Sequence, residues 1–142
     1  MSTVIESVRK WLTQYEGLKG RLDVDFLGED AEVYSIDTIP SEAIIKRYKD
    51  GSKVKQFLFA VSSRRYYEQN IEQNIDNLKF FEDLTEWIET KQYKKELPIL
   101  DNKRTALKIV VTSTAYPFEV SEDGKARYQT QMRLEYFERR GK

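Results

Sequence analysis

The chain of 142 residues contains no cysteine and no histidine. Without cysteine there is no disulfide, no thiolate metal site and no thiol nucleophile. Without histidine, the commonest general base and the commonest ligand of transition metals are both missing. An enzyme built on this chain would depend on carboxylates, lysine, tyrosine, serine or threonine, and no spacing of these residues indicates an activated nucleophile. We therefore predict a protein that is not an enzyme and uses no cofactor.

A surplus of charge of either sign is also absent, because 24 Lys and Arg residues balance 24 Asp and Glu residues. This balance argues against electrostatic steering to nucleic acid or to an anionic membrane. Long apolar runs are missing too, since the longest, at 57–61, is far too short to span a membrane. The first residues have the pattern of an amphipathic helix and not of a signal peptide. We expect synthesis in the cytoplasm and no membrane partner.

The hydrophobic fraction of 39% is enough for a core, and the length predicts a single domain over residues 1–142. Apolar spacing predicts one helix over 3–16 and a second from Ile71 to about Lys91. Alternating patterns predict extended segments, with hairpin turns at the Asp-Gly pairs 50–51 and 123–124. These segments are 22–26, 33–39, 43–48, 53–63, 105–115 and 127–136. The fold class is therefore α+β, with a mostly antiparallel mixed sheet of about five to six strands and two main helices packed on it.

Local signals make these expectations more specific. Thr3 and Glu6 form a capping box at the start of the first helix, which Gly17 and Gly20 can end, and Asn70 can cap the second helix. The segment 53–63 is apolar on both faces in its middle and should be central in the sheet. In the second helix an apolar stripe is expected to be buried, made of Ile71, Ile75, Leu78, Phe81, Leu84 and Ile88. In the strand over 105–115, three residues should point inward, namely Leu107, Ile109 and Val111.

Carboxylates gather between residues 23 and 37, with no Lys or Arg from 22 to 45. Oxygen ligands at this density can hold Mg²⁺ or Ca²⁺, and Asp23 and Asp25 would be the first candidates. Their spacing matches no calcium-loop pattern, because Gly28 follows only two aspartates and no glutamate closes the loop. A solvated strand face and turn is the favoured interpretation, so we predict no metal site.

Basic residues dominate the next stretch, from Ala43 to Tyr67, where Asp50 is the one acidic residue. Tyrosines at 48, 66 and 67 lie among them, and basic side chains with aromatic rings can track a phosphate backbone and stack bases. A nucleic-acid-binding hairpin over 43–67 is therefore the alternative function. A hairpin whose lysines protect a strand edge explains the same pattern. The basic residues are Lys46, Arg47, Lys49, Lys53, Lys55, Arg64 and Arg65.

Segregated acidic and basic stretches suit head-to-tail contact between copies, which closes into a ring or grows into a filament. The two stretches could equally pair within one subunit. For contact between subunits or with a partner, we expect Arg64 and Arg65 to be exposed and replaceable by glutamate without unfolding. The candidate interface residues are Arg64, Arg65, Tyr66, Tyr67, Lys53, Lys55, Asp23, Asp25 and Asp30.

Several segments, in the same order, resemble a family of bacteriophage minor capsid or tail-terminator proteins from phages and prophages of Gram-positive bacteria. The core of the likeness is PSEAIIKRYKDGSKVKQFLFAVSSRRYY at 40–67, preceded by VYSIDTIP. QNIDNLKFFEDLTEWIE, LPIL and ARYQTQMRLEYF follow it. The likeness covers most of the chain, and the joint order of these patterns carries it.

The resemblance implies a tail-terminator-like domain that assembles as a hexameric ring in the virion. Such a ring caps the head-proximal end of the tail tube, ends the polymerisation of the tube and docks to the neck or connector protein of the capsid. DNA would pass through the lumen of the ring without specific recognition. The family has no catalytic residues to transfer to this chain, which agrees with the missing histidine and cysteine.

Overall fold

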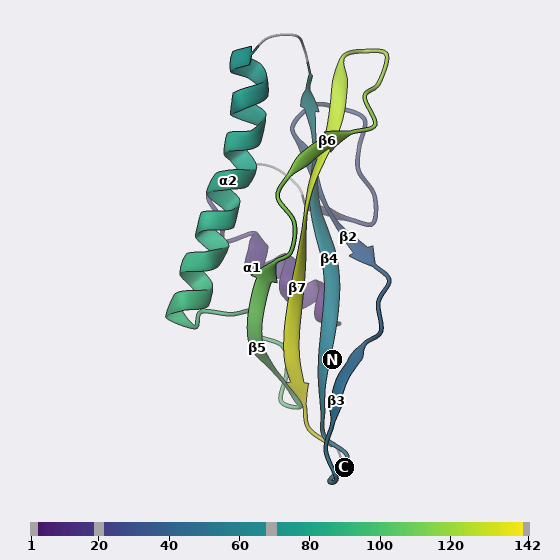
Figure 1. Ribbon diagram of the computed structural model, residues 1–142, viewed down its shortest axis with the longest axis vertical. Coiled ribbons are helices and arrows are strands. Elements are labelled where there is room, and N and C mark those ends of the chain that lie inside the picture. The colour runs from purple at the N-terminus through teal and green to yellow at the C-terminus, as the bar shows by residue number, and fades with distance from the viewer. Residues whose placement is uncertain (1–2, 19–21, 68–70, 141–142) are drawn as a thin grey trace.

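The computed structural model describes residues 3–18, 22–67 and 71–140. Within them the protein has an α+β fold of two helices and an open mixed sheet of seven strands (Figure 1). In chain order the elements are α1 (Val4–Leu12), β1 (Leu22–Val24), β2 (Val33–Ile39), β3 (Ile44–Arg47), β4 (Lys53–Tyr66), α2 (Ile71–Lys94), β5 (Arg104–Val111), β6 (Tyr116–Phe118) and β7 (Lys125–Glu138). The predicted fold class is confirmed, with one strand more than expected.

The sheet is built around the two long strands β4 and β7, whose antiparallel register runs from Lys53 opposite Glu138 to Tyr66 opposite Lys125. The strand order is β1-β2-β4-β7-β5, with β3 on the lower part of β4 and β6 on the upper part of β7. Among the described strands, β1 and β2 are the one pair that runs in parallel. β4 therefore lies in the middle of the sheet, as its two apolar faces predicted, and it continues three residues beyond the predicted end at Ser63.

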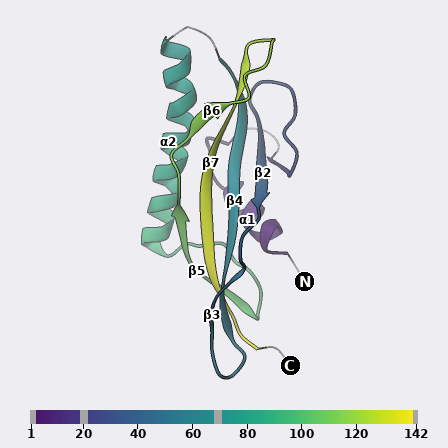
Figure 2. The same ribbon diagram turned by 45° about the vertical axis from the view of Figure 1, so that its right-hand side comes forward.

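One face of the sheet carries the core and both helices. Every second residue of β7 from Ala126 to Tyr136 is buried, which is the alternation expected of a strand with one covered face. Phe59 and Val61 of β4 add to this face, against Leu12 of α1 and Phe81 of α2. The lower ends of β4 and β7 and the β3–β4 hairpin extend beyond the helices, so the molecule is elongated (Figure 2).

The start of α1 confirms Thr3 as the N-cap and one of the two bonds of the predicted capping box, whereas the Glu6 carboxylate bonds to the Thr3 hydroxyl. The Glu6 N–H donates to Thr3 Oγ1 at 3.2 Å, and the Thr3 hydroxyl donates to a Glu6 carboxylate oxygen at 3.2 Å. The predicted end of this helix at the glycines is wrong. The helix ends at Leu12, where the Thr13 hydroxyl bonds to the Lys10 carbonyl and the chain turns. Gly20 and the predicted cap Asn70 lie outside the described residues.

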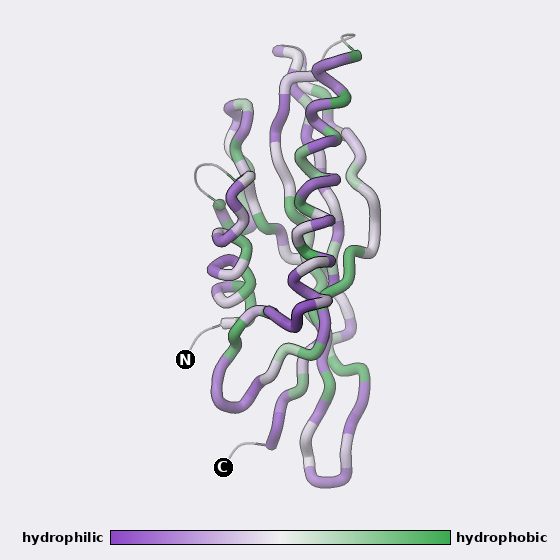
Figure 3. The backbone as a smooth tube through the Cα atoms, turned by 90° about the vertical axis from the view of Figure 1, so that its left-hand side faces the viewer, coloured by the Kyte–Doolittle hydropathy of each residue, from purple (hydrophilic) through white to green (hydrophobic). Residues whose placement is uncertain are grey.

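The predicted buried stripe of α2 is only half correct. Phe81, Leu84 and Ile88 are buried, whereas the apolar residues of the first turns, Ile71, Ile75 and Leu78, are exposed. The polar Asn77 takes the inward position there. The physical reason is helix geometry, because at about 100° per residue the three exposed residues lie about a third of a turn from the buried stripe that includes Asn77 and Phe81. That stripe faces the sheet, where both residues contact Tyr128 of β7. Figure 3 shows α2 in front of the sheet.

Three further expectations about the strands are corrected. β1 ends at Val24, before the predicted end at 26, because Asp25 has a left-handed backbone with φ 52°, and both Val24 and Phe26 are exposed. β5 has a bulge between Ala106 and Lys108, which turns Leu107 outward and leaves Ile109 as the buried residue of the strand. The short strand β6 was not predicted, because a three-residue segment around a proline has no readable alternation.

Candidate functional site

The upper end of β4 presents two arginines, and both contact the chain's own residues. Arg64 Nε donates to the Gly28 carbonyl at 2.7 Å. The Arg65 guanidinium lies 4.3 Å from the centre of the Phe80 ring and 3.7 Å from a Glu32 carboxylate oxygen, and its side chain is 11% exposed. The expectation that these arginines are exposed is therefore wrong for Arg65 and only partly met for Arg64. A role of either in contact with a partner stays a prediction.

The two neighbouring tyrosines differ from each other. Tyr66 is exposed, and its carbonyl accepts a hydrogen bond from Asn77 Nδ2 at 2.7 Å. Tyr67 packs against the core, and its N–H donates to the Gly124 carbonyl at 2.7 Å. Of the predicted group at 64–67, Tyr66 is the side chain best placed to contact another molecule.

The lysines of the predicted interface lie at the opposite end of the same strand. Ten residues separate Lys55 from Arg65, which corresponds to about 33 Å at about 3.3 Å per residue of extended chain. Lys55 pairs with Glu138 at 2.9 Å, and Lys53 lies beside it at the start of β4. A single basic surface over 43–67 is therefore not formed, because a 14-residue strand holds its two ends apart.

The acidic stretch lies beside the upper end of β4, within the same subunit. Asp25 accepts hydrogen bonds from the Thr38 N–H and hydroxyl at 2.7 and 2.9 Å, so its carboxylate caps the edge of β2. Asp23 is half-buried on β1, and Asp30 lies exposed in the following turn. Over 3–18, 22–67 and 71–140, no three Asp or Glu side chains come together in a way that could hold a metal ion.

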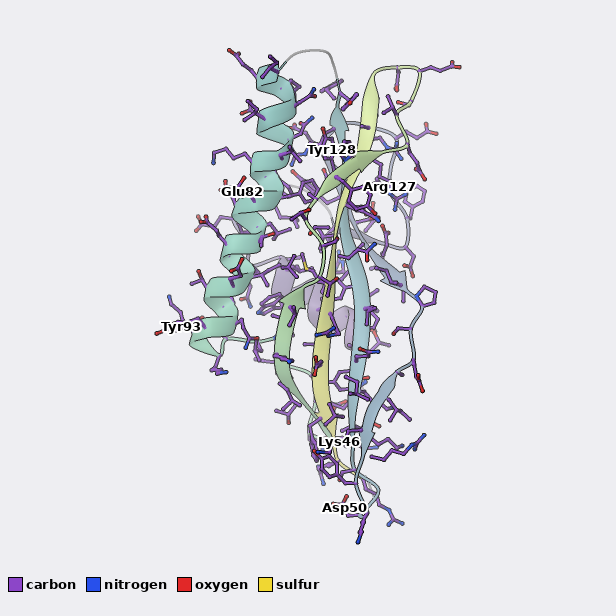
Figure 4. The ribbon with its side chains drawn as sticks, viewed as in Figure 1. Lys46, Asp50, Glu82, Tyr93, Arg127 and Tyr128 are labelled. Carbon is purple, nitrogen blue, oxygen red and sulfur yellow. The ribbon has the colours of Figure 1, made fainter. Side chains whose placement is uncertain are left out.

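A carboxylate on the helix-free face of the sheet organises a polar cluster that the sequence did not reveal. Asp37 accepts hydrogen bonds from Ser35 Oγ at 2.8 Å, from Ser62 Oγ at 2.7 Å and from Arg127 Nη2 at 2.5 Å. Figure 4 shows Arg127 on β7 at the upper end of this face. Together with the Arg65–Glu32 pair, these contacts favour the interpretation that the acidic stretch and the basic residues near it pair within one subunit.

Three basic residues of the β3–β4 hairpin make no ion pair with the described part of the chain. Lys46, Arg47 and Lys49 are all exposed, and Lys46 Nζ lies 5.1 Å from the centre of the exposed Tyr48 ring. Gly51 holds the turn with φ 93°, a conformation that favours glycine. The labelled residues Lys46 and Asp50 mark this hairpin at the lower end of the molecule (Figure 4). The Asp-Gly pair predicted the hairpin, but its projection beyond the helices depends on the lengths of β4 and β7.

An open groove of about 950 Å³ runs between the second half of α2 and β5. The helix contributes Thr85, Glu89 and Gln92 to its wall, and β5 contributes Ile109 and Val111. Gln92 Oε1 accepts a hydrogen bond of 2.8 Å from the Ile109 N–H, which points away from β7. No sequence pattern indicated this groove, because it depends on where the helix lies relative to the strand edge.

Neither described helix is long and apolar enough to cross a bilayer. Comparison of the chain with models of known protein families finds no match, and comparison with curated proteins finds none either. The functional interpretation therefore depends on the sequence patterns and on the geometry described above.

Proposed function

We propose that the protein is a structural virion protein that forms a ring at the head-proximal end of a phage tail tube. The ring would end tube polymerisation and present a face to the neck or connector protein. Each subunit would make the same head-to-tail contact with its two neighbours, and DNA would pass through the lumen without base-specific contacts. The family resemblance motivates this function.

One structural observation supports the proposal most strongly. At its lower end the sheet consists of β3, β4, β7 and β5, and no strand in the described part of the chain pairs with the outer side of β3 or of β5. Unpaired strand edges attract further strands. A subunit with a free edge on each side can bind one neighbour on the left and one on the right, which is the requirement for a heterologous ring.

Deletion of the gene from the phage or prophage that carries it tests this function. Without a terminator, tube polymerisation would continue, so we expect tails longer than normal and heads that stay unattached in electron micrographs. Supplying the intact gene in trans should restore normal length and joining. Particles of normal length with attached heads after deletion would contradict the proposal.

The β3–β4 hairpin gives one observation in favour of the alternative, a nucleic-acid-binding module. Its exposed lysines and arginine surround Tyr48, which could stack on a base. This function predicts binding of single-stranded DNA or RNA that weakens steeply with salt and is lost in a Lys46→Glu, Lys49→Glu variant. Absence of binding at about 50 mM salt would exclude it.

A further inference from the structure

Side chains of the described residues occupy backbone hydrogen-bonding groups on the outer edges of β1 and β2. Arg9 Nε donates to the Leu22 carbonyl at 2.7 Å on the outer side of β1. Asp25 covers the amide of Thr38 on β2. Pro117 has no amide hydrogen to offer on β6. Two edges of the described sheet are left for pairing, those of β3 and of β5, and they lie on opposite sides at the lower end.

The upper half of the β5 edge is arranged to receive a strand. The Thr112 N–H donates to the Gln131 carbonyl of β7, so by alternation the backbone groups of Ile109 and Val111 point away from β7 and into the groove. Gln92 Oε1 occupies the position at which a neighbouring strand would place a carbonyl oxygen. A single side-chain rotation of Gln92 would free the Ile109 amide for such a strand.

Strand direction identifies the strand that fits. β3 and β7 are both antiparallel to β4, and β5 is antiparallel to β7. β3 and β5 therefore run in opposite directions. When a second copy keeps the same orientation, as it does in a head-to-tail ring, its β3 meets β5 of the first copy in the antiparallel sense. The sheet then continues from one subunit to the next with every lower strand antiparallel to its neighbours.

The charges of the two elements are complementary. The hairpin from 43 to 55 has five basic residues against Asp50, and α2 has six acidic residues against three lysines. Lys46 and Arg47 of the hairpin are exposed, as are Glu82 and Glu89 of α2. Glu82 and Glu89 are seven residues apart, so they share one side of the helix, and Glu89 lines the groove. Figure 4 shows Lys46 and Glu82 at these separate places on one subunit.

We propose that β3 of one copy adds to the outer edge of β5 of the next copy, where it displaces Gln92 Oε1 from the Ile109 N–H, with its lysine and arginine toward the acidic side of α2. This contact deepens the proposed function and depends on it, because it names the edges that close the ring. Backbone pairing would supply most of the affinity, and the charges would favour the correct partner and register.

Cross-linking in a chain without cysteine tests the contact directly. Ile45 of β3 and Tyr93 at the groove are both exposed, so Ile45→Cys with Tyr93→Cys places one thiol on each side of the contact. The matched control joins Ile45→Cys to Ile71→Cys, because Ile71 is also exposed on α2 but lies outside the groove. A short bismaleimide should link the first variant into trimers and larger species at about tenfold the yield of the control, because contact raises the local thiol concentration to about the millimolar range.

Exchange of the charges at Lys46 and Glu89 provides a second test of the contact, measured as self-association. Lys46→Glu should weaken self-association in analytical ultracentrifugation by about tenfold, and adding Glu89→Lys to the same chain should restore it. Lys10→Glu on the exposed side of α1 is the control and should leave association unchanged.

The β3–β5 contact is overturned if both double-cysteine variants cross-link equally. It is also overturned if the protein stays monomeric at every concentration and no cross-linked trimers or larger species form. Stable oligomers that do not cross-link through these cysteines would overturn the contact too, and would mean that other surfaces form the ring. The tail-length phenotype of the gene deletion is independent of these results, so failure of the contact and failure of the proposed function are distinguishable.

Discussion

The guanidinium of Arg65 lies over the ring of Phe80, with its central carbon 4.3 Å from the ring centre. The same group is 5.7 Å from the centre of the Tyr34 ring and pairs with Glu32. The end of β4 is thereby held to β2 and to α2 at once. Arg65 therefore joins three elements of its own subunit, and its predicted contact with another molecule stays a prediction.

Reversal of this charge should destabilise the monomer. Arg65→Glu would place a carboxylate against two aromatic rings and beside Glu32, and we expect a loss of about 2–4 kcal/mol in the free energy of unfolding. Urea denaturation followed by fluorescence of the two tryptophans would measure it. Arg47→Glu in the exposed hairpin is the matched control and should change stability by less than about 0.5 kcal/mol. Equal stability of the two variants would show that the stacked arginine is not structural.

Asn77 connects α2 to the two central strands. Its Nδ2 donates to the Tyr66 carbonyl at 2.7 Å and to the Tyr128 hydroxyl at 3.3 Å, and its Oδ1 accepts from Gln73 Nε2 at 2.9 Å. Asn77→Ala would remove the donor from the buried Tyr128 hydroxyl and from the partly buried Tyr66 carbonyl, so we expect a loss of about 2–3 kcal/mol in thermal or chemical denaturation.

Gln73→Ala serves as the control for that variant. It removes the partly buried bond to Asn77 Oδ1 and leaves both bonds from Asn77 to β4 and β7, so its cost should be below that of Asn77→Ala, at about 1 kcal/mol. A loss for Asn77→Ala as small as this would mean that the amide is not required to hold α2 on the sheet.

The pair Asp101 and Arg104 makes stability depend on pH in the acid range. Hydrogen bonds from Arg104, the shorter of them 2.7 Å, lower the pKa of the Asp101 carboxyl from 3.8 to about 2. The unfolded chain therefore binds this proton more readily than the folded protein. The stabilisation is complete above about pH 4 and is lost as the pH falls toward about 2.

Asp101→Asn should abolish the pH-dependent stabilisation that the Asp101–Arg104 pair provides. We expect a lower melting temperature at pH 7 and a shallower decline between about pH 4 and pH 2 than in the unaltered protein. Melting temperatures across this range would show it, with Glu86→Gln on the exposed side of α2 as the control. Parallel pH profiles for the unaltered protein and Asp101→Asn would exclude a stabilising role for the pair.

Local patterns predicted those parts of the fold that local chemistry determines. Three such features were confirmed: the alternation of β7, the Asp-Gly turn at residues 50 and 51, and the N-cap at Thr3. All three depend on neighbours in the chain. The exposure of Ile71 and Ile75 was not predictable in this way. It depends on which side of α2 faces the sheet, because the apolar residues of its first turns and those of its second half lie on two different sides of the helix.

The candidate site was harder to predict for the same reason. Sequence proximity suggested that Lys55 and Arg65 form one surface, but an extended strand separates residues that are close along the chain. The groove beside Gln92 is formed by segments that are 17 residues apart at their hydrogen bond and have no joint sequence signal. Only the topology reveals that β3 and β5 are free and oppositely directed.

The central claim concerns the position of the protein in an assembled particle. Electron microscopy of tails, with gold-labelled antibody against this chain, measures that position directly. The account predicts label at one end of each tail only, the end that joins the head, and a ring of repeated subunits there in averaged images. Label along the whole tube, label at the opposite tip, or particles without the protein would contradict it.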